Sequence, residues 1–143
     1  MIDGWKHWIL VGVAVLGGCA TLPPGETPVD SAPVSENTAV AALVSQARAD
    51  LDAGRRSNAA AALERALRIE PRNAALWREL AKVRLADGRY DQAEQLAAKS
   101  NSFAGSDRAL RAANFRLIAD ARAARGDTAG AQSALDHARE LAR

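Results

Sequence analysis

The sequence has little of the chemistry on which most enzymes depend. It holds one cysteine and two histidines among 143 residues, and aromatic residues make up only 4% of it. A single cysteine excludes an intrachain disulfide. We find no nucleophile with a nearby base, no metal-ligand cluster and no Gly-rich phosphate loop. His137 stands between Asp136 and Arg139, and we expect it on the surface. We therefore predict that the chain is not an enzyme, with no catalytic residue and no metal site.

Valine, isoleucine and aromatic residues are sparse, whereas alanine and arginine are abundant. That composition favours helices over strands, because alanine and straight side chains lose little freedom on entering a helix. Residues 38–143 hold 18 Lys and Arg against 13 Asp and Glu, a net charge of +5. This surplus mildly favours acidic partners. No nucleic-acid-binding motif accompanies it, so we predict no nucleic acid partner.

The only long apolar run stands near the start of the chain, from Trp8 to Leu16. Its nine residues are too few to span a bilayer, which needs about 20 in a helix. With Lys6 before it, the run has the length of the apolar region of a secretory signal peptide. The ending Leu-Gly-Gly-Cys19 resembles the bacterial lipobox, which implies a signal peptide over 1–18 and a covalent lipid on Cys19 as the only attached group. Ala20 in place of Asp implies sorting to the outer membrane.

Four of the five prolines lie between the cysteine and residue 37. This stretch has few large apolar side chains to bury, and proline cannot donate a backbone hydrogen bond. We therefore predict that residues 19–37 form a disordered, Pro-rich tether between the lipid and a folded domain over 38–143. At about 3.1 Å per residue such a tether reaches roughly 55 Å.

A helix-turn-helix pattern repeats three times from residue 38 onward. Its landmarks are Gly54, Gly88 and Gly126, spaced 34 and 38 residues apart, and an alanine follows each glycine by five residues. A glycine just past a helix end is suited to the left-handed backbone found there. We expect Ser57 to cap the second helix, and Asp91 with Glu94 to form a capping box. Four extra residues near Asn101–Ser106 lengthen either the connection of the second unit or the helix beyond it.

These residues resemble the tetratricopeptide repeat (TPR), with units at about 38–71, 72–105 and 106–143. The resemblance implies an all-α fold of three stacked helix pairs that form a short right-handed solenoid, since one pair cannot bury its own apolar face. Within the middle unit we expect Trp77 and Leu80 to be the best-packed residues. The residues expected to pack the repeats are Ala59, Leu63, Trp77, Leu80, Gly88, Tyr90, Ala93, Phe115, Gly126 and Ala131.

TPR domains bind peptides on the face formed by the first helix of each unit. Counting back from the turn glycines gives the equivalent positions here, and they form a groove that is basic in the middle and apolar at one edge. A groove of this kind suits an acidic or carboxylate-bearing segment, although solvated arginines would give the same pattern. The predicted groove residues are Val44, Arg48, Arg78, Lys82, Leu85 and Arg116.

The resemblance implies an outer-membrane lipoprotein that faces the periplasm and binds a protein of the cell envelope. Similar lipoproteins activate class A penicillin-binding proteins, and we predict that role in the regulation of peptidoglycan synthesis. Three alternatives remain open: a pilotin or assembly factor for pili, secretion or outer-membrane machinery; a structural module that self-associates; and a peptidoglycan-binding accessory protein.

Overall fold

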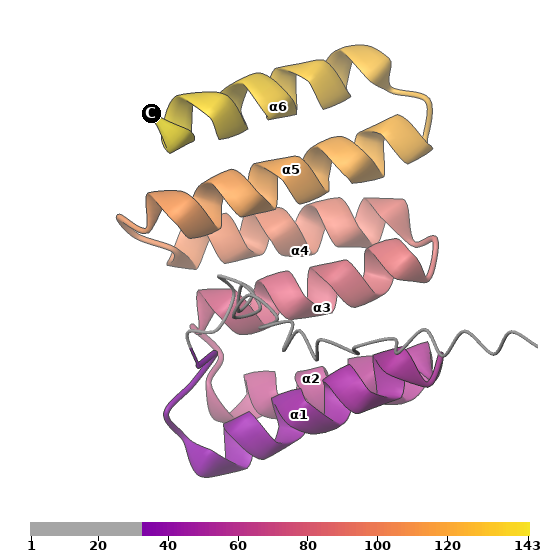
Figure 1. Cartoon of the computed structure of the whole chain (residues 1–143), viewed down its shortest axis with the longest axis vertical. Helices are drawn as coiled ribbons and strands as arrows, with labels where there is room; N and C mark the ends of the chain where they lie inside the picture. The colour runs from indigo at the N-terminus through magenta and orange to yellow at the C-terminus, as the bar shows by residue number, and fades with distance from the viewer. Residues whose placement is uncertain (1–32) are drawn as a thin grey trace, which may run out of the picture. The chain divides into compact units, whose positions relative to one another are not determined.

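The computed structural model describes residues 33–143, which form six α-helices and no strand (Figure 1). The all-α fold predicted for this part of the chain is therefore confirmed. The predicted signal peptide, Cys19 and the predicted tether up to residue 32 lie outside the described residues. The helices follow one another from α1 at one end to α6 at the other, with bounds Thr38–Asp52 (α1), Arg56–Ile69 (α2), Ala74–Ala86 (α3), Tyr90–Phe103 (α4), Arg108–Ala124 (α5) and Thr128–Ala142 (α6).

Each helix pair is closed by the same turn. In the second pair the backbone N–H of Arg89 donates to the carbonyl of Arg84 at 2.8 Å, and that of Gly88 donates to Leu85 at 3.0 Å. These two bonds satisfy the last carbonyls of α3 and define a Schellman motif, which needs a left-handed residue after the helix. Gly88 supplies it with a φ of 74°, as expected from the sequence.

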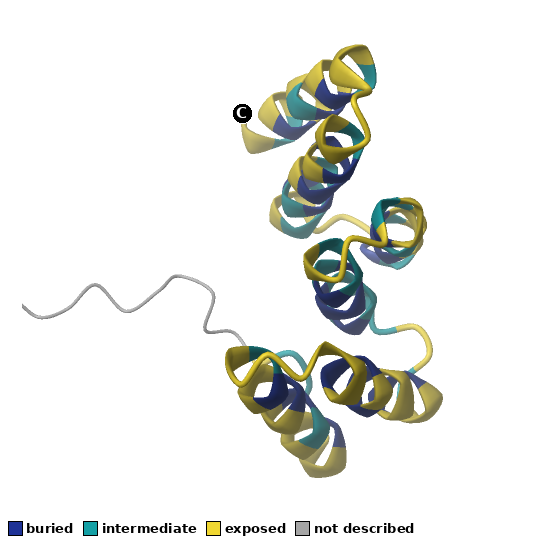
Figure 2. Cartoon of the chain, turned by 90° about the vertical axis from the view of Figure 1, so that its right-hand side faces the viewer, coloured by how far each residue is buried: buried dark blue, intermediate teal, exposed yellow. Residues whose placement is uncertain are grey.

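Small side chains line the contacts between helices, while leucine and valine fill the layers between pairs. The largest fully buried apolar side chains are those of Val40, Leu63, Leu76 and Val83. Figure 2 shows that buried positions face neighbouring helices and exposed positions face outward. Alanines at the crossings let the helix backbones approach closely, and those that are completely buried are Ala59, Ala62, Ala66, Ala81, Ala93, Ala97 and Ala121.

A buried polar network joins the second pair to the third. Ser100 on α4 donates to the carbonyl of Ala74 at 2.8 Å and accepts from the Asn114 side chain at 2.7 Å. The Asn114 amide also donates to Asn101 at 2.9 Å. Ser100 and Asn114 are completely inaccessible to solvent, so these bonds offset the cost of burying polar atoms and fix the register of α3, α4 and α5.

The four extra residues of the third unit lengthen its first helix. α5 has 17 residues, whereas α3 has 13, and the added turn runs from Arg108 to Arg111 at the start of α5. The spacing of the glycines left open whether the connection or the helix would grow. In the structure, the four extra residues lengthen helix α5 and not the connection before it.

Two predicted helix caps are wrong. α2 begins at Arg56 and α4 at Tyr90, and neither has a side-chain cap, because the N-cap residues Arg55 and Arg89 carry no side-chain acceptor. Ser57 therefore lies inside α2. Glu94 does not reach back to the start of α4, since its carboxylate binds Arg122 on α5 at 2.6 Å. Side-chain caps are found at the starts of the three first helices, from Asn37, Asn73 and Asp107, and at the start of α6, from Asp127.

The last residues assigned to the tether contact the helical region. Val34 packs against the core cluster, and its carbonyl accepts from the Asn73 side chain at 2.8 Å. Ser35 donates to Glu70 at 2.6 Å, and Asn37 caps α1. The predicted tether therefore ends before Val34 instead of at residue 37, because the Val34 side chain packs on the core and two polar groups find partners at the α2–α3 turn. We call residues 34–37 the N-terminal strap.

Candidate protein-binding site

The centre of the predicted groove is α3, where Arg78 and Lys82 stand one helical turn apart. A carboxylate lies between them: Glu79 is 3.5 Å from the Arg78 guanidinium and 3.1 Å from the Lys82 ammonium. The Glu79 side chain is only 9% exposed, whereas those of Arg78 and Lys82 are 21% and 41% exposed. The three side chains carry a net charge of +1, so the centre of the groove is less basic than the two cations alone suggested.

The neighbouring first helices add a cation each. Arg48 on α1 and Arg116 on α5 are exposed and make no ion pair with another described residue. Together with Arg78 and Lys82 they form what we call the first-helix face. An arginine that no carboxylate neutralises remains available to an acidic partner segment.

Two predicted groove residues belong to the core instead. Val44 is 4% exposed and lies in the cluster that joins the first and second pairs, so it is not available to a partner. Val44 occupies the same repeat position as Arg78. Because its side chain is apolar, it is buried in the core instead of facing a partner. Leu85 is half-buried and packs against the cluster between the second and third pairs.

Trp77 is only partly buried, contrary to the prediction that it would be among the best-packed residues. Leu76, the residue before it, is the one with no exposed surface, whereas Leu80 is buried as predicted. The Trp77 ring lies 6.5 Å from that of Phe103, and its indole N–H donates to the carbonyl of Pro71 at 2.9 Å. On its other side the ring borders a shallow groove of about 400 Å³ between α2 and α4.

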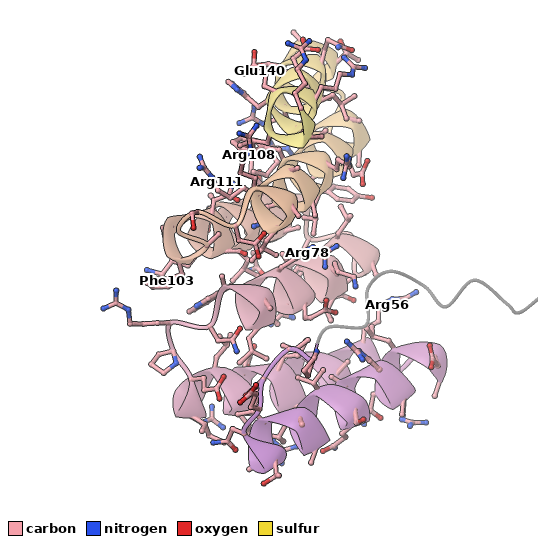
Figure 3. All side chains as sticks on the ribbon, turned by 60° about the vertical axis from the view of Figure 1, so that its left-hand side comes forward. Arg56, Arg78, Phe103, Arg108, Arg111 and Glu140 are labelled. Atoms are coloured by element: carbon pink, nitrogen blue, oxygen red, sulfur yellow. The ribbon has the colours of Figure 1, made fainter. Side chains whose placement is uncertain are left out.

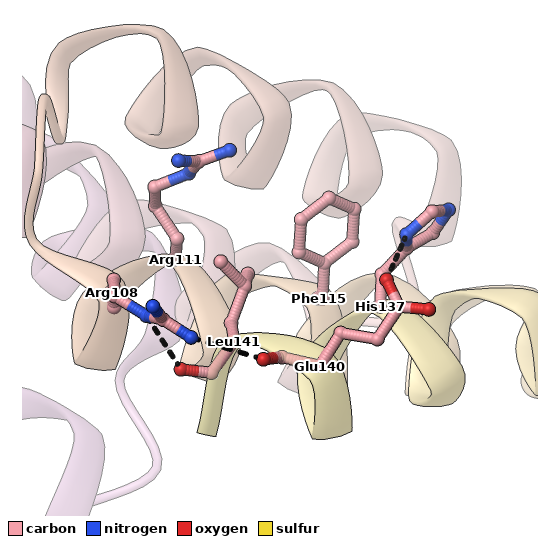
Figure 4. A pocket seen from close by; sticks show the side chains of 6 residues that line it. All are labelled: Arg108, Arg111, Phe115, His137, Glu140 and Leu141. Carbon is pink, nitrogen blue, oxygen red and sulfur yellow. Dashed lines mark hydrogen bonds and ion pairs between the residues drawn. The ribbon is translucent and has the colours of Figure 1, made fainter. Parts of the chain in front are cut away.

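A hollow of about 500 Å³ lies between the start of α5 and the end of α6 (Figure 4). Its apolar part consists of Phe115 and Leu141. Arg108 stands at the rim, where it donates to the carbonyl oxygens of Glu140 and Leu141, both at 3.1 Å. These bonds satisfy two carbonyls that the end of α6 would otherwise leave without partners.

The far wall of the hollow is His137, whose ring lies 5.2 Å from the ring of Phe115. Its Nδ1 is 3.7 Å from the carboxylate of Glu140. Figure 3 shows Arg108, Arg111 and Glu140 together on one side of the molecule. We call the site the α5–α6 hollow; it is lined by Arg108, Arg111, Phe115, His137, Glu140 and Leu141.

The sequence reasoning missed the α5–α6 hollow. His137 was correctly expected at the surface, since more than half of its side chain is exposed, but no partner was foreseen for it. The available signal was the four-residue lengthening before Gly126, which contains Arg108 and Arg111.

At the opposite ends of these helices, near the turn glycines, the charges are paired within the chain. Glu94 accepts from Arg122 at 2.6 Å and from Arg125 at 2.9 Å, and Arg125 also pairs with Asp91. The hydrogen bond to Glu94 raises the pKa of Arg122 above its usual value. Similar pairs join Arg84 to Glu64 and Arg55 to Asp50, both at 2.8 Å. These cations hold helices together and are less available to a partner.

Comparison with known proteins agrees with this architecture. The tetratricopeptide-repeat family matches residues 50–113. The helix pairs, their turns and this match define a TPR protein, a class of helical scaffolds that bind other proteins.

A solved structure gives a more particular relationship. The globular C-terminal domain of LpoP from P. aeruginosa is 42% identical to the chain and has a TM-score of 0.72; the match covers 73% of the chain and 99% of that domain. The chain therefore belongs to the tetratricopeptide-repeat family of the LpoP C-terminal domain. No curated protein matches the sequence significantly. Among residues 33–143, no helix is long and apolar enough to cross a membrane.

Proposed function

We propose that the chain is a lipid-anchored adaptor of the cell envelope that binds and activates a class A penicillin-binding protein. The observation that carries the proposal is the 42% identity with the LpoP C-terminal domain over 99% of that domain. The lipobox-like ending at Cys19 supports a lipid anchor at the outer membrane. The activating role extends the resemblance to activator lipoproteins described above.

The first-helix face is the surface that we assign to the partner. Arg48, Arg78 and Arg116 place guanidinium groups on three successive first helices, and a guanidinium can bind a carboxylate through two parallel hydrogen bonds. Glu79 holds Arg78 and Lys82 in place, which lowers the cost of ordering them when a partner binds. An acidic segment lying across these helices would meet one cation from each.

The test is the rate of glycan polymerisation by a class A penicillin-binding protein of the same organism, with and without the full-length chain in detergent. We expect the wild-type chain to raise the rate and the double change Arg78→Glu with Arg116→Glu to abolish most of the increase. Arg68→Glu is the matched control, because Arg68 is an exposed arginine on α2 outside the first-helix face. A wild-type chain without effect on any class A enzyme would refute the activating role.

The anchor has a separate test in cells. Cys19→Ala should leave the signal peptide uncut and remove the lipid, so the protein should no longer fractionate with outer membranes. Cys19→Ala that still fractionates with the outer membrane would show that the lipid is not the anchor. Adaptor function of the detergent-purified chain is unaffected by that outcome.

A further inference from the structure

The second and third helix pairs place side chains of the same kind at the same repeat positions. Trp77 and Phe115 both stand eleven residues before the turn glycine of their pair. In the second pair, Phe103 packs on Trp77 with a centroid separation of 6.5 Å. The Lys99 ammonium lies 4.8 Å from the Phe103 ring centroid and the Arg72 guanidinium 5.8 Å from it. The second pair thus covers its own aromatic residue with a ring that two cations contact.

The third pair lacks that ring. The position of Phe103, fifteen residues after the turn glycine, is occupied by Leu141, and the position of Lys99 by His137. Leucine is shorter than phenylalanine, and the α5–α6 hollow lies next to Leu141 and Phe115. One side of Phe115 contacts His137, and another borders the hollow.

The rim of the hollow carries more positive than negative charge. Arg111 forms no ion pair or side-chain hydrogen bond with another described residue, and Arg108 binds only backbone carbonyls. The one carboxylate of the lining, Glu140, faces His137. Both arginines lie in the turn that the third pair has and the second lacks, so the hollow and its cations have the same origin in the sequence.

We propose that the α5–α6 hollow binds an aromatic side chain of an acidic partner segment. The ring would pack on Phe115 next to Leu141, with Arg111 over its face, as Phe103 packs on Trp77 with Arg72 and Lys99 over it. Burial of an aromatic ring and its contact with a cation both favour binding, and such anchors carry much of the affinity of protein interfaces. Acidic residues flanking the ring meet Arg108 and Arg111. This inference rests on the proposed protein-binding function and specifies the chemistry of the partner.

His137 makes the hollow directly observable. It is one of two histidines in the chain, so a His7→Gln chain labelled with carbon-13 histidine gives a single signal from the wall of the hollow. The probe is the peptide acetyl-Asp-Glu-Phe-Asp-Glu-amide, added to the full-length chain in detergent. Matched probes replace Phe by Ala, or replace all four acidic residues by Lys.

We expect the Phe peptide to shift the His137 signal in a saturable manner, with at least tenfold higher affinity than either matched probe. Leu141→Phe fills the hollow from within, as in the second pair, and should weaken binding at least tenfold while the helix content is kept. Arg111→Gln, a change of an unpaired side chain, should weaken binding severalfold. Equal affinity for the Ala peptide, or unchanged binding by Leu141→Phe, overturns the proposal.

The same variants separate this inference from the proposed function. Arg78→Glu with Arg116→Glu alters the first-helix face and should leave the His137 shift unchanged. If the peptide does not bind a chain that still activates the synthase, the proposal that the hollow binds an aromatic side chain is wrong, and the proposed function stands. A peptide that binds the hollow of a chain without effect on any class A synthase supports the hollow and refutes the activating role.

Discussion

The second and third helix pairs carry an aromatic residue at the same position, and only in the second pair does a phenylalanine ring stack on it. In the second pair Phe103 lies against Trp77, and Arg72 and Lys99 contact its ring. In the third pair Phe115 faces a hollow with arginines at its rim. The two pairs share the same turn, at Gly88 and at Gly126. A shorter side chain at one repeat position therefore leaves a hollow where the neighbouring pair has a packed ring.

The difference also has a backbone part. The first helix of the second pair is capped by Asn73. The side-chain amide of Asn73 donates to the Val34 carbonyl and to the Glu70 carboxylate. The third pair begins one turn earlier, at Arg108. Residues of the N-terminal strap contact the start of the second pair, and the added arginine-bearing turn occupies the start of the third. The strap at the second pair and the added turn of the third pair can therefore be altered separately by mutation.

We expect the largest effect on stability from removing the two aromatic side chains, with a greater loss at Trp77 than at Phe115. Trp77→Ala should lower the free energy of unfolding by about 3 kcal/mol, because it removes the stack with Phe103 and the bond to Pro71. Phe115→Ala should cost about 2 kcal/mol, since that side chain is smaller, has no stacked phenylalanine and makes no hydrogen bond. Urea unfolding followed by circular dichroism measures both, with Trp77→Phe as the control. Equal losses would show that the two positions are packed alike.

The shared turn should respond equally in the two pairs. Gly88→Ala and Gly126→Ala should each lower the free energy of unfolding by about 1 kcal/mol, because both glycines have a positive φ. A Cβ would meet nothing within 4 Å at either site, so the cost is backbone strain alone. Asparagine, which tolerates this backbone better, should recover part of the loss. A twofold difference between the two sites in thermal or urea unfolding would contradict the equivalence of the turns.

A smaller change should make the third pair resemble the second. Leu141→Phe places a ring against Phe115, and we expect it to raise the free energy of unfolding by about 0.5 kcal/mol. Urea unfolding can resolve this when the variants are measured side by side. The control is Leu141→Met, which changes shape without adding a ring. A loss of stability with Leu141→Phe would show that the hollow cannot accommodate the ring.

The smallest effect concerns the start of the second pair and depends on pH. Hydrogen bonds from Ser35 and then Asn73 lower the pKa of Glu70 below its usual 4.5. Their stabilising contribution is therefore fully present above pH 4.5, and it is lost as the pH falls through the lowered pKa of the folded state. Ser35→Ala should lower stability more near neutral pH than at pH 3. Unfolding curves at both pH values test this, with Glu36→Gln as a control; an equal loss at both would exclude Glu70 as the cause.

The periodicity of the sequence predicted the helix pairs and their turns because glycine spacing and apolar stripes are local signals. It predicted poorly where a side chain had two possible roles. Trp77 and Leu76 are adjacent, and the structure buries Leu76 completely and Trp77 only in part. Val44 occupies a groove position by count, but its apolar side chain is buried against neighbouring helices.

The α5–α6 hollow could not be derived from the sequence, since its existence depends on how the extra residues are used. In a connection they would have formed a longer loop; in α5 they place Arg108 beside the end of α6. The network of Ser100 and Asn114 was missed for a related reason. Its partners lie 14 and 26 residues apart in the chain, and no local pattern marks such pairs.

The N-terminal strap has a mechanical consequence. Val34 and Ser35 are bonded to Asn73 and Glu70, so tension on the chain before Pro33 passes to the α2–α3 turn without first unwinding α1. For a protein held to a membrane by its amino end and to a partner by its helices, the load would enter at the start of α3, where Asn73 caps the helix. Single-molecule pulling from residue 33 should rupture the strap before α1 extends, and early unravelling of α1 would show that the strap carries no load.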